Sequence, residues 1–360
     1  MSTVFPAHAS TDRPVLVSTP RRPGSHRRIN LALQGGGAHG AFTWGVLDRL
    51  LEDGRVSFEG ISGTSAGAMN AVVMADGLLT GGRDGAREAL QAFWLAVANS
   101  TPFDLGSIPS PDSMSHGATA PVRALLQWTR FFSPAQINPL DLNPLRDIIL
   151  AQVDFARLRR SRDIKLFVAA THAKSGKLRI FRTPEVSAEA VLASACLPTI
   201  HRAVEIDGEP YWDGAYAANP AVFPLFYECF ARDNVIVLLS PLEHGPTPRT
   251  ATEIQHRASD IAFNATFLRE MRMFAFLRER AEQSPAGAGR LEKRLMRTHF
   301  HIIEASHVLG DLAMESKLIA SRQFVEQLRE LGREQAQVWL RRHVAHIGNR
   351  STVDLAKLFA

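Results

Sequence analysis

Short apolar runs that stop at glycines alternate with segments of helical spacing in the first eighty residues. Residues 29–33 (INLAL) end at a glycine stretch, and residues 40–52 follow with apolar side chains every three or four positions. A second run at 56–61 precedes another glycine turn and a small-residue helix that ends near Gly77. Short continuous apolar runs indicate buried strands, and a 3.6-residue period indicates helices. The pattern predicts β-α-β-α with short connections, which is typical of a parallel sheet covered by helices.

The remainder of the chain continues this mixed pattern. Further strands are predicted at 165–171, 177–182, 204–206, 211–212, 235–239 and 299–303. Asp207-Gly208 would turn the hairpin between two of them, and Asn143-Pro144 would open a helix as cap and first residue. A small-residue helix is predicted at 186–196, and helical spacing predominates beyond residue 250. We therefore expect an α/β fold with a mainly parallel central sheet flanked by helices.

Composition divides the chain into regions. Residues 1–28 carry five arginines among scattered Pro and Ser without an apolar signal core, so they predict a disordered basic N-terminal tail. Residues 29–240 form the main predicted domain. Within it, seven prolines interrupt 100–145, which predicts a loop-rich insertion with a short helix near 122–132. Such an insertion can form a lid or a passive surface excursion. Residues 241–360 are predicted to be a mainly helical C-terminal region.

Bulk composition is that of an ordinary globular protein, with 45% hydrophobic and 21% charged residues in 360. The net charge of +5 fits an anionic membrane surface, nucleic acid or a general basic bias. Cys196 and Cys229 form no metal-ligand pattern, so we expect buried free thiols in a reducing compartment. No apolar run approaches a membrane span. We expect a cytoplasmic protein that meets lipid, if at all, from the membrane surface.

A glycine turn with a central serine carries the first candidate chemistry. Gly63-Thr64-Ser65-Ala66-Gly67 has the form Gly-x-Ser-x-Gly between a predicted strand and a predicted helix. In a nucleophile elbow the serine occupies a strained turn of this kind and exposes its hydroxyl. An ordinary glycine-rich turn is the alternative. Ser65 is a nucleophile only if an oxyanion site and a base accompany it.

The earlier turn, residues 34–40 (QGGGAHG), has three interpretations. Gly-x-Gly-x-x-Gly between a strand and a helix can bind a dinucleotide, with Glu59 near the offset of a ribose partner. The same glycines can direct consecutive N–H groups at one oxygen, as in an oxyanion hole. A tight turn that needs positive φ is the third. The serine turn favours the oxyanion hole, because both turns would lie together at the carboxyl edge of adjacent strands.

Either an aspartate or a histidine could act as the base. Asp213 follows Tyr211-Trp212 and precedes Gly214-Ala215, where burial would raise its pKa toward that of a general base. A plain Asp-Gly turn is the alternative at this position. A Ser-Asp-His triad also stays open, because five histidines lie downstream: His244, His256, His299, His301 and His307. The small number of strands before Ser65 argues against a standard α/β-hydrolase.

The three motifs QGGGAHGAF, GTSAG and DGA, in this order, resemble those of the patatin-like phospholipases. The resemblance covers about residues 28–239 and includes the flanks FEGISGTSAGAMNA and ASACLPTIHRAVEIDGEPYWDGAYAANP. It implies a patatin-like three-layer fold with residues 29–240 as the catalytic domain. The family often has Arg or Lys where this chain has His39, and its third motif is Asp-Gly-Gly or Asp-Gly-Ala.

The resemblance also implies roles for individual residues. Ser65 would be the nucleophile and Asp213 the base, in a dyad without a catalytic histidine. The oxyanion N–H groups would come from Gly35, Gly36, Gly37 and Ala38, with Ala66 as a further donor. The motifs would be supported by Gly40, Gly63, Gly67, Gly214 and Ala215.

The implied activity is hydrolysis of acyl esters of phospholipid or a related lipid through an acyl-enzyme. No cofactor, metal or nucleic acid is expected. Phe263, Phe267, Met271 and Phe274 recur at helical spacing beside arginines, which fits either a membrane-surface helix or a core-facing helix with a basic face. A helix near 335–347 would serve self-association or membrane docking. The competing functions are a triad esterase, a nucleotide-binding protein that uses Gly35–Gly40, and an inactive lipid-binding or scaffold protein.

Overall fold

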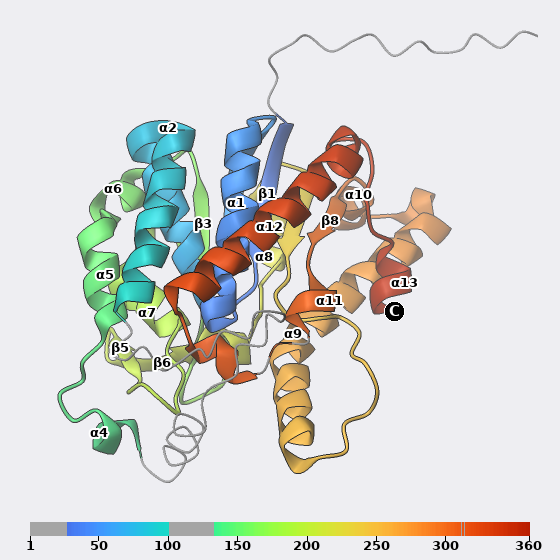
Figure 1. Ribbon diagram of the computed structural model, residues 1–360. Coiled ribbons are helices and arrows are strands. Elements are labelled where there is room, and N and C mark those ends of the chain that lie inside the picture. The colour runs from blue at the N-terminus through green and yellow to red at the C-terminus, as the bar shows by residue number, and fades with distance from the viewer. Residues whose placement is uncertain (1–26, 101–132, 311, 313) are drawn as a thin grey trace, which may run out of the picture.

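The computed structural model describes residues 27–100, 133–310, 312 and 314–360. In this part of the chain, an eight-stranded sheet has the order β5-β6-β3-β2-β1-β7-β8, with β4 also paired to β3. The parallel strands are β1 (Arg27–Leu33), β2 (Val56–Thr64), β3 (Lys165–His172), β7 (Asp233–Val237) and β8 (His299–Ile303). The antiparallel strands are β4 (Leu178–Arg182), β5 (Val204–Ile206) and β6 (Glu209–Asp213). Helices flank this sheet (Figure 1), which confirms the predicted fold class.

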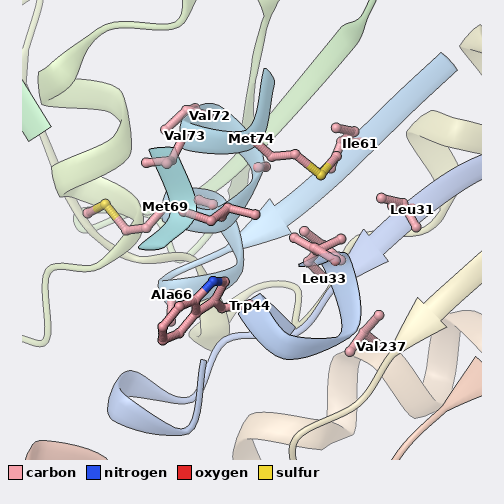
Figure 2. Close-up of a cluster of buried hydrophobic side chains, with 14 of the residues drawn as sticks. Leu31, Leu33, Trp44, Ile61, Ala66, Met69, Val72, Val73, Met74 and Val237 are labelled. Carbon is pink, nitrogen blue, oxygen red and sulfur yellow. The ribbon is translucent and has the colours of Figure 1, made fainter. Parts of the chain in front are cut away.

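One face of the sheet is covered by the helices that follow the two glycine turns and by a late helix. These are α1 (Gly40–Asp53), α2 (Ala66–Asn99, kinked at Gly81–Gly82) and α12 (Arg322–His343). Figure 2 shows Leu31, Leu33 and Val237 of the strands in one cluster of buried hydrophobic side chains with Trp44 of α1 and Met69 of α2. Toward β3 the same core continues into short helices: α5 (Pro144–Gln152), α6 (Phe155–Arg160) and α7 (Ala188–Ser194). The described side chains of the short helix α4 (Pro134–Ile137) are not part of this core.

The alternate residues of the same strands face a second core. Ala32 and Ile236 pack there with α8 (Phe223–Glu228), α9 (Ala251–Gln283) and α13 (Leu355–Phe359). Burial on both faces explains why the parallel strands have continuous apolar runs. Phe267, Met271 and Phe274 of α9 are buried in this core, which supports the core-facing interpretation of that helix.

The C-terminal region completes the main sheet. Strand β8 pairs with β7, and α12 packs on α1, so residues beyond 241 contribute to both the sheet and its cover. The remaining helices of this region are α10 (Arg290–Met296) and α11 (Ser306–Leu309). The helix predicted at 335–347 is the second half of α12, which ends at His343 and continues as a 3-10 turn, Val344–His346.

Several predicted boundaries move by a few residues, as helix and strand ends commonly do. Strand β1 begins at Arg27, inside the predicted tail, and β7 begins two residues earlier than predicted. Residues 1–26 of the tail and 101–132 of the insertion, with its predicted helix, lie outside the described residues. None of the described helices combines the length and apolar character needed to cross a membrane.

Candidate active site

The register of the sheet brings Ser65 and Asp213 together. Strand β4 occupies one edge of β3 along Phe167–Thr171, so β2 and β6 must share the other edge. Thr64, the last residue of β2, pairs with Ala169, and Asp213 pairs with the next residue, Ala170. The chain leaving β2 at Ser65 therefore meets the end of β6, and the Ser65 side chain is close enough to the Asp213 carboxyl group to lower its pKa.

Ser65 has the geometry of a nucleophile elbow. Its φ of 54° lies in the left-handed region, where a residue with a side chain is strained. The turn is held by the Ser65 N–H, which donates to Ser194 Oγ at 2.9 Å. Helix α2 begins at the next residue, so its first N–H groups lie beside the serine. Gly67 allows this helix to approach β1, because a Cβ there would come within 2.2 Å of the Leu33 carbonyl oxygen.

Asp213 is buried, and both its side chain and its backbone are held by hydrogen bonds. Its Oδ1 accepts a hydrogen bond from Ala215 N at 2.8 Å, and its backbone oxygen accepts one from Thr171 Oγ1 at 2.8 Å. Burial raises the pKa of Asp213 to about 7, although the hydrogen bonds from Ala215 and Ser65 lower it. A carboxyl group with this pKa accepts and returns a proton near neutral pH, which is the property of a general base.

The glycine-rich loop lies directly against the serine. A Cβ on Gly35 would come within 2.7 Å of Ser65 Cβ and of the Thr64 carbonyl oxygen. The Gly35 N–H donates to Asn219 Oδ1 at 2.7 Å, so this predicted oxyanion donor is already occupied. Gly36 is half-buried and Gly37 is exposed. Among the hydrogen bonds of the described residues, none uses the N–H of either glycine. These two N–H groups therefore have no partner among the described residues, and the neighbouring residues Ala38 and Ala66 are buried.

A buried amide network fixes this loop, and the sequence analysis did not identify it. Gln34 Nε2 donates to Asn264 Oδ1 at 2.8 Å and to the Asn219 backbone oxygen at 3.2 Å. Gln34 Oε1 accepts from the N–H groups of Leu239 and Ser240 at 2.6 and 2.9 Å. Asn219 lies in the segment AANP that follows the third motif, and the motif pattern gave no signal for this contact. The network joins the loop after β1 to the segments after β6 and β7 and to α9.

His39 contributes no positive charge to this loop. It is buried, and burial together with nearby Lys317 lowers its pKa to about 3. Its Nε2 shares a hydrogen bond with Ser316 Oγ at 2.7 Å, and its ring packs edge-on against Phe324. The neutral imidazole thus serves packing against the C-terminal region, at a position where the family often has a cation.

Two of the five downstream histidines lie too far from Ser65 to form a triad with it. His299 begins β8 opposite Asp233, the first residue of β7, and is therefore at the amino edge of the sheet. His301 is buried within β8 and bonds Asp233 at 3.1 Å and Thr352 at 3.0 Å. Since Ser65 follows the carboxyl end of β2, a triad with either histidine is excluded. The side chain of His307 lies outside the described residues. His244 and His256 lie beyond β7 in the C-terminal region, and their replacement tests the triad.

The residues proposed for a nucleotide are engaged elsewhere. Buried Glu59 accepts hydrogen bonds from Phe230 N at 2.8 Å, Ala231 N at 2.7 Å and Lys165 Nζ at 3.1 Å. Its carboxylate therefore stabilises the protein at this position and is not available to a ribose. Gly35 is occupied by Asn219. In the described ranges, no group of three or more His, Cys, Asp or Glu side chains is arranged to hold a metal ion.

Comparisons with known proteins agree with the motifs. A family model described as patatin-like phospholipase matches residues 31–226, a range that contains both glycine turns and Asp213. Among solved structures, VipD from Legionella pneumophila is similar, with 16% sequence identity and a TM-score of 0.41. That similarity covers 88% of this chain and 67% of VipD. A search of curated proteins gave no match.

Proposed function

Because this chain belongs to the patatin-like phospholipase family, we propose that it hydrolyses acyl esters of lipids with a Ser65–Asp213 dyad. The family itself implies a lipid acyl hydrolase. The observation that carries the finer assignment is the approach of the Ser65 side chain, at the end of β2, to a buried carboxyl group at the end of β6 whose pKa is raised to about 7. Peripheral contact with the membrane that holds the lipid is part of this proposal.

Acylation uses the dyad and the glycine loop together. Asp213 accepts the hydroxyl proton while Ser65 Oγ forms a bond to the ester carbonyl carbon. The carbonyl electron pair moves to oxygen, where the N–H groups of Gly36 and Gly37 and the start of α2 stabilise the negative charge. When the ester C–O bond breaks, Asp213 returns its proton to the leaving alcohol, and the acyl group stays on Ser65.

Deacylation repeats the same steps with water as the nucleophile. Asp213 accepts a proton from water, the new C–O bond forms, and the bond to Ser65 Oγ breaks. The proton on Asp213 then returns to Ser65 and the fatty acid leaves. One carboxyl group thus acts alternately as base and acid, for which a pKa close to neutral is suited.

We expect a fluorophosphonate probe to form a covalent adduct on Ser65 of the full-length protein. The dyad predicts this because the probe reports an activated serine beside an oxyanion site. Peptide mass spectrometry locates the adduct, and the Ser65→Ala protein serves as the blank. If folded wild type stays unlabelled both in solution and with anionic vesicles, Ser65 is not an activated nucleophile and the proposal fails.

Replacing His244 or His256 with Ala is expected to leave ester hydrolysis close to that of the wild type. The reason is that Asp213 already contacts the serine and no described histidine contributes to the pKa of Asp213. Steady-state kcat/KM on a soluble ester measures the effect. A decrease of about two to four orders of magnitude in either variant would instead identify a catalytic histidine and a triad.

A further inference from the structure

A concave site lies at the edge of the sheet opposite the dyad. It is a cleft of about 770 Å³ between residues 226–234, at the start of β7, and residues 288–298, which include α10. Arg232 of this cleft precedes the first residue of β7, whereas Ser65 follows the last residue of the parallel strand β2. The cleft and the dyad are therefore separated by the length of the sheet.

Four cations without an ion-pair partner line the cleft. Arg290, Lys293 and Arg297 recur at three- and four-residue spacing along α10 and its C-terminal cap, so they share one helix face. Arg232 contributes a fourth charge from the segment before β7. All four are exposed, and within the described ranges none forms a salt bridge. Like charges so arranged repel one another, and an anion in the cleft would relieve that repulsion.

Apolar and aromatic side chains stand beside these charges. Phe230 is 84% exposed, and Tyr227 and Leu291 are more than half exposed, although all three are large. The N–H groups of Phe230 and of the next residue donate to buried Glu59, so this part of the wall is fixed before any ligand arrives. Arg294 and Phe226 also line the cleft, and the Arg294 guanidinium group lies over the Phe226 ring at 5.4 Å from its centre.

We propose that this cleft is a binding site for an organic phosphate, a molecule with a phosphate group and an attached apolar or aromatic part. Arginine favours phosphate because its planar guanidinium group donates two parallel hydrogen bonds. The volume lies in the range of small-molecule sites, about 300–1,000 Å³. The hollow shape and the fixed wall favour a discrete ligand over a membrane surface. The inference is independent of the dyad, because neither Ser65 nor Asp213 belongs to the cleft.

Calorimetric titration of the full-length Ser65→Ala protein tests the site without turnover of the probe. The probes are dihexanoyl phosphatidic acid below its micelle concentration, adenosine diphosphate and inorganic phosphate, which separate a lipid source from a nucleotide and from the bare anion. We expect saturable one-to-one binding of one organic phosphate, at least tenfold tighter than inorganic phosphate. Adding Arg290→Glu and Arg297→Glu should weaken it by at least tenfold.

Two further variants separate specific binding from general charge. Arg162→Glu with Arg272→Glu makes the same change in net charge at exposed residues that do not line the cleft, and this pair should keep the affinity. Phe230→Ala should reduce the preference for organic over inorganic phosphate, because it removes the apolar contact. An equal loss of affinity in both pairs of charge-reversal substitutions would overturn the proposal. So would an absence of saturable binding, or binding to anionic vesicles alone.

Discussion

Replacing Asp213 with Asn is expected to lower kcat/KM for ester hydrolysis by about two to four orders of magnitude, the usual contribution of a general base. An amide in this place can still accept the hydrogen bond from Ala215 N but cannot take the Ser65 proton. The serine then has to attack as a neutral hydroxyl group. Initial rates on a soluble ester, together with the rate of fluorophosphonate labelling, measure the loss.

The pH profile identifies the titrating group in the wild type. The base acts as a carboxylate, so kcat/KM should rise with pH and level off above a pKa near 7, the value that burial gives Asp213. At pH 5 the group is protonated and the activity should be low. A profile that levels off near pH 4, the range of an ordinary carboxyl group, would contradict a buried base.

Thermal unfolding of the variant tests whether the loss of activity is chemical or a loss of folding. In the wild type the folded state keeps the Asp213 proton up to a pKa near 7, whereas the unfolded chain loses it near pH 4. Folding therefore becomes less favourable as pH rises between these values, and an amide, which does not titrate, avoids that decrease. Asp213→Asn should thus unfold at no lower temperature than wild type at pH 8. Asp207→Asn, in the other Asp-Gly turn, is exposed and should keep full activity.

The parts of this site that the sequence predicted are those that follow from local geometry. Two strand-turn-helix units give two turns at one sheet edge, and parallel strands bring the turns side by side. Gly35 packs against Ser65 for this reason. The strained φ of Ser65 is likewise a property of the elbow motif. The roles of Ser65 and Asp213 came from the family resemblance, and the pairing of β6 with β3 then supplied the geometry that joins them.

The parts that the sequence left open depend on partners far along the chain. Asn219 occupies the Gly35 N–H across 184 positions, and Ser316 bonds His39 across 277. Neither pairing has a periodic signal, because single hydrogen bonds between loops leave no repeat in the sequence. The burial that makes His39 neutral arises from α12 and the segment before it, which pack on the glycine loop only in the folded chain. The charge near an oxyanion site is thus a tertiary property.

Gly35→Ala is expected to lower kcat/KM by about two to three orders of magnitude, the scale of losing one oxyanion donor. The added Cβ would meet Ser65 Cβ and the Thr64 carbonyl oxygen at 2.7 Å, both in a buried turn with little freedom to shift. The loop must therefore move away from the serine, and the N–H groups of Gly36 and Gly37 move with it. Overpacking of this kind costs about 1–3 kcal/mol, so the protein should still fold.

Gly245→Ala provides the matched control, because a Cβ at this position would meet no atom within 4 Å. It should keep wild-type activity and unfolding temperature. The decisive comparison is between turnover and labelling in Gly35→Ala. If the loop supplies the oxyanion donors, both reactions slow together, since each forms a negative oxygen beside Ser65. Unchanged turnover in a folded Gly35→Ala protein would mean that the donors lie elsewhere, which leaves the start of α2 as the anion site and gives the glycine loop a packing role alone.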